Sequence, residues 1–517
     1  MDLSDWRAKL RSLFGPLAER NHIVILNWSA IGPDLVRALV DPPGRTERIV
    51  VMADHEPGAI VSDISRAAGD AGVSRTLVRR GETGEAASLG TVFPETARAI
   101  VVLSPPGAEP DSRVVKTVLS LVKDPMRRTG RYRIVAEVRD PANADLLAAI
   151  GGNEVQAVHP DDVVARMLVQ TARQPGLAAV FHELLDFSGP EIHTVDQPEL
   201  SGNAFGDALM AYETATLIGI ADGDGRARLN PPSETMLTDG MRAIVIADGV
   251  DAIRIAADRI SVDGAAISLV RPGPKVPERT LVLGWNRRVP TIAHETALYV
   301  MPGSVMTIAA NIPDLLERVG KVTLPNDHMT LECAVVDTTS RSVLEGLNLM
   351  SYDHVLVLGD GDAPAGERDT RALMALLQLR RIAETRNAHI NIVGEVTDAR
   401  SGVLAETANA DELIVANTVT SLMLAQAAGN DTLTAIFSDL LDEAGSELYL
   451  KPASHYVEPG RPVNFYTIVE AARRKGEIAI GYIRENAGGE SSPVINPTKT
   501  ETISYGTEDR IVVIAKE

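Results

Sequence analysis

The stretch that decides the fold reads His22-Ile-Val-Ile-Leu-Asn27-Trp28-Ser29-Ala-Ile-Gly32, an apolar run of strand length followed by a tight turn. A helical stretch follows over 33–39, and the next apolar run, Ile49–Ala53, ends at the acid Asp54. A strand, a turn, a helix and a second strand ending in an acid are typical of the start of a doubly wound α/β domain.

The turn is also the candidate cofactor site. In dinucleotide-binding domains such a turn holds the pyrophosphate, and the acid after the second strand binds the ribose. Here Asn27 stands at the first glycine position of G-x-G-x-x-G, and only Gly32 remains. We therefore name Asn27, Ser29, Gly32 and Asp54 as the candidate residues. The indole of Trp28 favours packing between helix and sheet, and a dinucleotide is the less favoured alternative.

Composition limits the classes of function. At 517 residues the chain is long enough for roughly three or four domains. The 70 acidic residues outnumber the 50 Lys and Arg, giving a formal charge of −20. This charge argues against general nucleic-acid binding, which needs clustered cations, and is compatible with divalent cations. Acidic surfaces more often serve solubility.

Cysteine content and hydropathy indicate a soluble chain in a reducing compartment. Cys333 is the single cysteine, so no intrachain disulfide, Cys-based zinc site or CxxC pair can form. Its surroundings, Leu331-Glu-Cys-Ala-Val-Val336, predict a buried strand. No apolar stretch approaches the roughly 20 residues that span a bilayer, and the polar start shows no signal peptide.

Short strands alternate with helices through the first third of the chain. This rhythm predicts a parallel sheet of about six strands that ends near Gln174-Pro-Gly176. Further strands are expected at 74–78, 99–103, 134–138 and 154–158, and helices at 112–121, 142–150 and 160–172. After a helix over 177–185, residues 191–260 read as strands and turns, which indicates a small α+β module.

The sequence repeats itself in order. Leu177–Asp186 recurs as Leu433–Asp442, and Arg242–Ala247 recurs as Arg510–Ala515. Shorter matches join Leu26-Asn-Trp28 to Leu283-Gly-Trp285, Asp111-Ser-Arg113 to Asp369-Thr-Arg371, and Leu229-Asn-Pro231 to Ile495-Asn-Pro497. We infer a tandem duplication of a Rossmann-like doubly wound domain followed by a small α+β module. Such duplications more often build symmetric assembly surfaces than a single catalytic site.

The repeat predicts six segments. They are a linker helix at 1–20, a first Rossmann-like domain at 21–173, its module at 174–260, a linker at 261–277, a second Rossmann-like domain at 278–430 and its module at 431–517. An amphipathic helix is expected within 4–14, and Pro272-Gly-Pro274 stiffens the central linker.

The order of domains and several short motifs resemble the soluble part of the CASTOR/POLLUX family of cation channels, which is built from RCK domains (regulator of potassium conductance). The motifs that carry this resemblance are Asn27-Trp28-Ser29, Gly284-Trp285 followed by Arg287-Arg288, the two Asp-x-Arg motifs at 111–113 and 369–371, the hinge Arg173-Gln-Pro-Gly-Leu177, Lys451-Pro-Ala453 and Ile495-Asn-Pro497. The similarity runs from about residue 20 to the end.

The resemblance implies a cytosolic gating ring beneath a membrane pore. Four chains would form a homotetramer of eight RCK domains, and ligand binding, with Ca²⁺ a candidate, would act on the pore. Family members carry transmembrane helices before the first RCK domain, so the chain is expected to be a soluble fragment or a separate subunit. It would be cytoplasmic, and at the membrane if attached to a pore.

Carboxylates at strand ends are the candidate metal ligands, because Ca²⁺ needs several converging oxygens. Glu137 and Asp140 end one predicted strand, and their repeat mates Glu395 and Asp398 end another, at the sheet edge where ligands collect. Asp222/Asp224 and Asp360/Asp362 are further clusters, although Asp-Gly-Asp is first a turn signal.

The two Asp-x-Arg motifs have an adequate structural explanation. Asp111 and Asp369 are expected to cap the helices that they begin, and Arg113 and Arg371 to pair with an acid across a domain interface.

An enzyme is not expected. The sequence lacks G-x-S-x-G, H-E-x-x-H and the Walker motif, and His55, His159 and His182 are isolated. The alternative functions are an NAD(P)-dependent oxidoreductase with duplicated domains and a stand-alone nucleotide-binding regulatory protein. The degenerate turns count against the oxidoreductase, and no classical NAD site is expected in the second half.

Overall fold

The computed structural model describes residues 20–42, 46–125, 127–223, 226–256, 261–270, 273–361, 365–407, 412–430, 432–484 and 492–516. The expected helix within 4–14 lies outside these residues. Asp224, Asp362 and Pro272 lie outside them as well.

The first half contains a six-stranded parallel sheet, as predicted, in the order β3-β2-β1-β4-β5-β6. Its strands are β1 (Ile23–Leu26), β2 (Ile49–Ala53), β3 (Thr76–Arg80), β4 (Ala99–Val102), β5 (Ile134–Glu137) and β6 (Val155–Val158). The order reverses between β1 and β4. Because crossovers between parallel strands are right-handed, this reversal places the helices before and after it on opposite faces.

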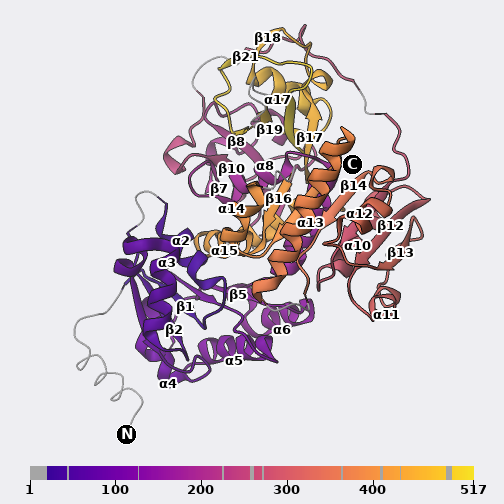
Figure 1. Ribbon diagram of the computed structural model, residues 1–517. Coiled ribbons are helices and arrows are strands. Elements are labelled where there is room, and N and C mark those ends of the chain that lie inside the picture. Colours follow the sequence, from indigo (N-terminus) through magenta and orange to yellow (C-terminus); the bar gives the residue numbers. More distant parts are fainter. Residues whose placement is uncertain are drawn as a thin grey trace. The chain divides into compact units, whose positions relative to one another are not determined.

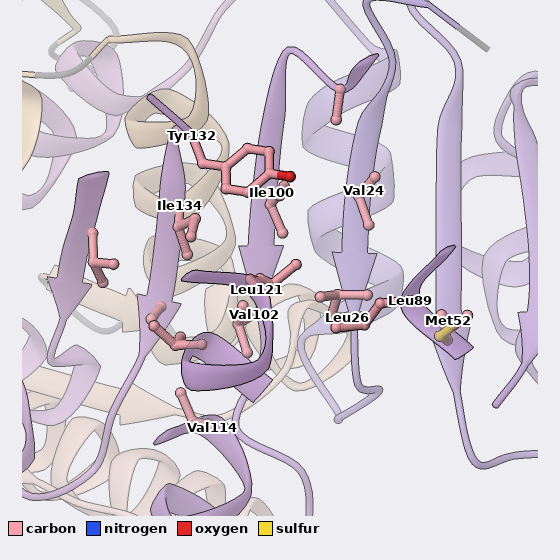
Figure 2. Close-up of a cluster of buried hydrophobic side chains, with 14 of the residues drawn as sticks. Val24, Leu26, Met52, Leu89, Ile100, Val102, Val114, Leu121, Tyr132 and Ile134 are labelled. Carbon is pink, nitrogen blue, oxygen red and sulfur yellow. The ribbon is translucent and has the colours of Figure 1, made fainter. Parts of the chain in front are cut away.

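Helices cover both faces of this sheet (Figure 1). They are α2 (Gly32–Val40), α3 (Pro57–Arg75), α4 (Ala86–Leu89), α5 (Pro110–Val122) and α6 (Pro141–Gly151). Figure 2 shows the core on the α5 face, where Val24, Leu26 and Ile100 of the strands meet Val114 and Leu121 of α5. Alternate strand residues are buried on the other face, so the strands read as continuous apolar runs.

The second half repeats this sheet in the order β13-β12-β11-β14-β15-β16. Its elements are β11 (Arg279–Leu283), α10 (Val289–Tyr299), β12 (Ser304–Ala310), α11 (Leu315–Gly320), β13 (Met329–Val335), α12 (Arg341–Gly346), β14 (His354–Val357), α13 (Ala365–Arg386), β15 (Ile392–Val396), α14 (Ala399–Thr407) and β16 (Glu412–Val415). The predicted strand around Cys333 is β13, but the prediction that it is buried was wrong. It is an edge strand, and Cys333 is half-buried.

Each half also has a four-stranded antiparallel sheet. The first, β7-β10-β8-β9, follows α8 (Leu177–Leu185), and the second, β17-β22-β19-β20, follows α16 (Leu433–Leu440). The remaining elements are β7 (Glu191–Asp196), α9 (Phe205–Ala208), β8 (Ala215–Ala221), β9 (Ala227–Leu229), β10 (Arg242–Ala247), β17 (Glu447–Pro452), β18 (Pro462–Asn464), α17 (Phe465–Arg473), β19 (Ile478–Ile483), β20 (Pro493–Ile495), β21 (Thr502–Ser504) and β22 (Arg510–Ala515).

The repeated Asn-Pro motifs connect the two modules reciprocally. The amide nitrogen of Asn230 donates to the carbonyl of Gly476 at 2.9 Å, and that of Asn496 donates to the carbonyl of Thr214 at 2.9 Å. Both asparagines have a left-handed backbone, with φ of 40° and 52°, a conformation that asparagine tolerates better than most residues. The duplication therefore holds the modules together as a pair.

One helix of each half is exchanged. The chain divides into two compact units, one comprising the part up to Asp161 with Asn417–Thr434, the other the remainder. Helix α15 (Ala416–Gly429) thus packs beside α2 (Figure 1), where the hydroxyl of Ser421 donates to the carbonyl of Ile31 at 3.2 Å. Helix α7 (Pro160–Arg173) belongs almost wholly to the second unit.

Candidate functional site

A cavity of about 220 Å³ opens at the carboxyl end of the first sheet. It lies where the strand order reverses between β1 and β4, the place at which open α/β sheets bind ligands. The residues that line it are Asn27, Trp28, Ala53, Asp54, His55, Gly81, Glu82, Thr83, Gly84, Pro105, Arg113, Lys116 and Thr117.

Asn27 holds the turn after β1 in place. Its backbone is left-handed, with φ of 67°. Its side-chain nitrogen donates to the carbonyl of Leu103 at 3.0 Å, and its oxygen accepts from the hydroxyl of Thr83 at 2.6 Å. Thr83 in turn contacts the hydroxyl of Thr117 at 2.9 Å. The Asn27 amide therefore joins three loops of the cavity wall.

Trp28 and Gly32 are placed by packing. A Cβ added at Gly32 would lie 2.7 Å from the indole of Trp28, so only glycine fits beneath this ring. Trp28 is 5% exposed. The hydroxyl of Ser29 is buried and has no hydrogen-bond partner among the described residues. Of the four candidate cofactor residues, Asn27 and Asp54 line the cavity, whereas Ser29 and Gly32 do not.

The cavity wall carries charges of both signs. Arg113 and Lys116 come from α5, and Asp54 and Glu82 follow β2 and β3. The stem of Lys116 crosses Gly84, where an added Cβ would lie 2.6 Å from the Lys116 Cε atom. Asp54 is exposed, and the Arg80 guanidinium lies 3.5 Å from its carboxylate. The two cations of α5 can bind an anionic group of a ligand, and the two acids can accept hydrogen bonds from its hydroxyl groups.

Sequence reasoning missed Thr83, Lys116 and Thr117 as cavity residues. A signal existed for Thr83, because Gly81-Glu82-Thr83-Gly84 follows a strand at the edge of the sheet where ligands bind. Lys116 and Thr117 lie on a helix at ordinary spacing, and nothing in the sequence distinguishes them.

At the corresponding place in the second half, three side chains bind one another. The amide nitrogen of Asn286 donates to the carbonyl of Gly359 at 3.2 Å and to Glu395 at 2.9 Å. Arg288 forms an ion pair with the other oxygen of Glu395. Both oxygens of this buried carboxylate are thus engaged by the protein.

The other predicted metal ligands also accept hydrogen bonds from the protein. Glu137 accepts from the amide of Ser104 at 2.8 Å, and Asp140 caps α6 through the amide of Ala142 at 3.0 Å. The carboxylate of Asp398 accepts hydrogen bonds from the backbone amides of Arg400, at 3.0 Å, and of Ser401, at 2.9 Å. Within the described ranges, no three His, Cys, Asp or Glu side chains are grouped so that they could hold a metal ion.

The two Asp-x-Arg motifs differ from expectation. Asp111 does not cap its own helix. Its carboxylate accepts from the amides of Arg139 and Asp140 at 2.9–3.1 Å and so fixes the turn before α6. Asp369 likewise accepts from the amides of Thr397 and Asp398 and fixes the turn before α14. Neither Asp caps its own helix, because each lies inside the helix and faces the end of the next strand. Arg371 pairs with Asp360 at 3.5 Å at the same sheet edge.

Comparison with known proteins gives the relatives of this chain. The family described as "Castor and Pollux, part of voltage-gated ion channel" matches residues 161–263. The probable ion channel POLLUX of Arabidopsis thaliana is 28% identical over 548 residues, 98% of this chain and 66% of the relative. The ion channel CASTOR of Lotus japonicus is 28% identical over 558 residues, 98% of this chain and 64% of the relative. The chain is similar to the CASTOR and POLLUX ion channels along nearly its whole length.

The CASTOR/POLLUX relatives are longer than this chain, which spans about 66% and 64% of the two named above. Among solved structures, the human SLO3 gating ring matches with a TM-score of 0.69 at 14% identity, covering 96% of this chain and 99% of that one. This likeness confirms the predicted fold, in which a doubly wound α/β domain and a small α+β module occur twice. In the part of the chain that the structure describes, no helix has both the length and the apolar character needed to cross a bilayer.

Proposed function

We propose that this chain is the regulatory gating-ring part of a cation channel, cytoplasmic and attached to or associated with a membrane pore. The observation that carries the proposal is similarity to CASTOR and POLLUX along 98% of the chain, together with the gating-ring fold over 96% of it. In this role the protein binds and assembles, and it catalyses no reaction.

A homotetramer of eight RCK-type domains is the proposed assembly. This assembly is supported by two exposed leucines in the first repeat that have exposed leucines at the corresponding positions of the second repeat. Leu119 of α5 corresponds to Leu377 of α13, each eight residues after the Asp of the Asp-x-Arg motif, and Leu146 of α6 corresponds to Leu404 of α14. They are 42%, 53%, 45% and 61% exposed. A duplicated apolar surface of this kind suits contacts between copies of the chain.

Light scattering tests the assembly. We expect a particle of four times the chain mass, and we expect the double variant L377D/L404D to reduce it to smaller species. L316D is the matched control, because Leu316 is 72% exposed but has no such counterpart in the first repeat. A chain that stays monomeric at every concentration, or equal effects of both variants, would contradict the ring.

An anionic nucleotide is the second proposed element, favoured by the cavity in the first half. Arg113 and Lys116 would hold phosphate oxygens, and Asp54 would accept from ribose hydroxyls. Calorimetry with ADP and NAD tests this. R113A/K116A should weaken binding at least tenfold, whereas K123A, just past the end of α5, should not. Absence of binding by the unmodified chain would rule the proposal out.

Ca²⁺ at the strand-end carboxylates is the third proposed element. Glu137 with Asp140, and Glu395 with Asp398, would need to exchange their present hydrogen bonds for the ion. Light scattering with and without millimolar Ca²⁺ should show a change of radius in the unmodified chain that D140N or D398N weakens. An unchanged Ca²⁺ titration in both variants would exclude these sites.

A further inference from the structure

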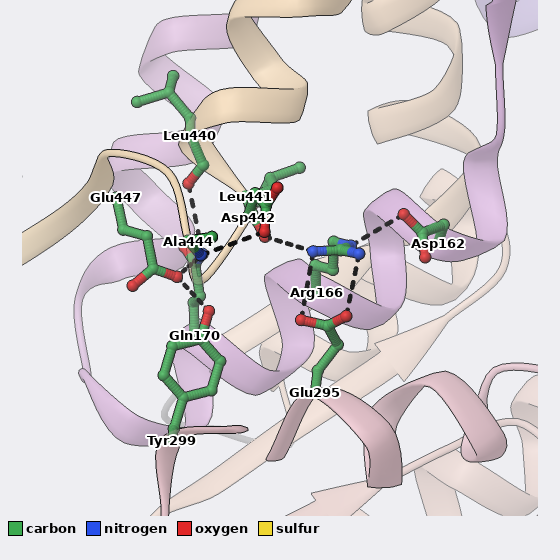
Figure 3. Close-up of polar contacts among 10 residues, drawn as sticks. All are labelled: Asp162, Arg166, Gln170, Glu295, Tyr299, Leu440, Leu441, Asp442, Ala444 and Glu447. Carbon is green, nitrogen blue, oxygen red and sulfur yellow. Dashed lines mark hydrogen bonds and ion pairs between the residues drawn. The ribbon is translucent and has the colours of Figure 1, made fainter. Parts of the chain in front are cut away.

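A buried group of polar side chains surrounds Glu295 in the second compact unit (Figure 3). Glu295 lies on α10 and is 2% exposed. Arg166 of α7 contacts both of its oxygens, at 3.0 and 3.2 Å. The same guanidinium reaches Asp162 at 2.9 Å and the carbonyl of Leu441, after α16, at 3.0 Å. One arginine thus joins three elements that are far apart in sequence.

A second layer lies one turn further along α7. The amide nitrogen of Gln170 donates to Glu447 of β17 at 2.8 Å. The hydroxyl of Tyr299, on α10, donates to the same oxygen, and that of Tyr449 donates to the other oxygen at 2.7 Å. Glu447 is 4% exposed. Two buried carboxylates, Glu295 and Glu447, thus hold α7 to α10 and to β17.

The charges of this cluster do not balance. Glu295 faces Asp162 from α7, Asp442 from the turn after α16, Glu447 from β17, and one cation, Arg166. Arg173 lies over the ring of Tyr299 at 4.9 Å and acts on Glu447. Burial, with the neighbouring acids, raises the pKa of Glu295 to about 7 against the opposing effect of Arg166, and burial also raises that of Glu447.

We propose that this cluster is a proton-dependent latch that holds α7 to the second half of the chain, tighter when protonated and looser when ionised. Helix α7 leads directly into the Gln174–Gly176 turn and α8. Detachment of α7 would therefore affect the position of the module that begins with α8. The inference does not depend on which ligand or pore the protein serves.

The sign follows from linkage. The attached state binds the proton at a pKa of about 7, whereas a detached, solvated glutamate has a pKa near 4.5. Between these values the attached state holds more protons, so its population relative to the detached state falls as pH rises. Above about pH 7 the effect levels off. When Glu295 is neutral, it no longer repels its three acidic neighbours. Its carbonyl oxygen can still accept a hydrogen bond from Arg166.

Hydrogen exchange of the full-length chain tests the latch. Protection of α7 and α10 amides, corrected for the intrinsic exchange rate, should fall about tenfold from pH 6 to pH 8. E295Q, which mimics the protonated form, should remove this pH dependence and keep the protection of the acidic state. E345Q is the control and should retain the dependence, because Glu345 pairs with Arg341 within α12 and faces no group of the latch.

A second variant covers the case in which E295Q does not fold. Asp442 is exposed, and its charge helps to raise the pKa of Glu295. D442N should therefore move the midpoint of the protection change to lower pH without removing it. Protection that is independent of pH in the unmodified chain, or a midpoint that D442N leaves in place, would overturn the proposal.

Discussion

Glu412, in the last strand of the second parallel sheet, caps the helix that begins after Gly176. Its two carboxylate oxygens accept hydrogen bonds from the amides of Gly176 and Ala178, the latter at 3.2 Å. In the first sheet, Gln156 of β6 accepts from the hydroxyl of Thr434, at the start of α16, at 2.8 Å. Each helix that begins a module is thus held by the sheet of the other repeat.

Replacing Gly176 by alanine should destabilise the second compact unit by about 2 kcal/mol. The residue has φ of 100°, which disfavours any side chain, and an added Cβ would lie 3.2 Å from Leu450 and 3.3 Å from Ile483. Urea unfolding measures the loss. Gly202, with φ of 85° but no atom near its Cβ position, is the control, and G202A should lose about 1 kcal/mol. Equal losses would show that the packing around Gly176 does not matter.

Replacing Glu412 by glutamine should loosen α8. The amide keeps one acceptor but loses the charge that interacts favourably with the helix N-terminus, a loss of about 1 kcal/mol. Hydrogen exchange at the first turn of α8 should rise by about fivefold, while the amides of α16 stay unchanged. A uniform rise in both helices would instead indicate a general loss of stability.

Replacing Asp111 by asparagine should destabilise the first unit by about 2 kcal/mol, because an amide group would face the backbone N–H groups of Arg139 and Asp140. Because Asp369 makes equivalent contacts in the second repeat, D369N should produce the same loss there. Thermal unfolding followed by hydrogen exchange assigns each loss to its unit. A loss confined to α5 in D111N would restore the simpler explanation that Asp111 caps its own helix.

Because of Lys499, the free energy of unfolding should increase as the pH rises above neutral. Its side chain is fully buried, and its ammonium donates to Thr216 at 3.2 Å and to the carbonyl of Ala215. Burial lowers its pKa to about 7, below the value near 10.5 in the unfolded chain. The folded state therefore holds fewer protons between these values, and stability should rise by up to about 1.4 kcal/mol per pH unit.

The variant K499M tests this contribution. It should flatten the rise in unfolding free energy between pH 7 and pH 9, whatever its effect on stability at pH 7. A slope that is unchanged in K499M would assign the rise to other groups.

The fold could be read from the sequence because its signals are local. Continuous apolar runs such as Ile23–Leu26 and Ile49–Ala53 indicate strands buried on both faces, and the matching of Leu177–Asp186 to Leu433–Asp442 indicates the duplication. The likeness to gating rings then agrees with the predicted pairing of domains. Burial of Cys333 was predicted wrongly, because an apolar run does not show whether its strand lies at a sheet edge.

The sites were less predictable, because their partners are distant in sequence. Asn27 and Asp54 could be named from the strand ends that precede them, but Thr83 reaches Asn27 from another loop. Glu295 is more than a hundred residues from Arg166, and no motif joins them. The calcium and nucleotide assignments of the strand-end residues stay predictions.

The exchanged helix α15 has a consequence for how the protein is made. The first unit takes in Asn417–Thr434, so it cannot be completed until more than four fifths of the chain has left the ribosome. Contacts between residues this far apart slow folding, since a long loop must close before they form. Until then the residues around Ile31, at the start of α2, lack the helix that packs against them, and a chain truncated before residue 417 should need a chaperone or aggregate. The two halves of the duplicated chain are therefore expected to fold as one protein and not one after the other.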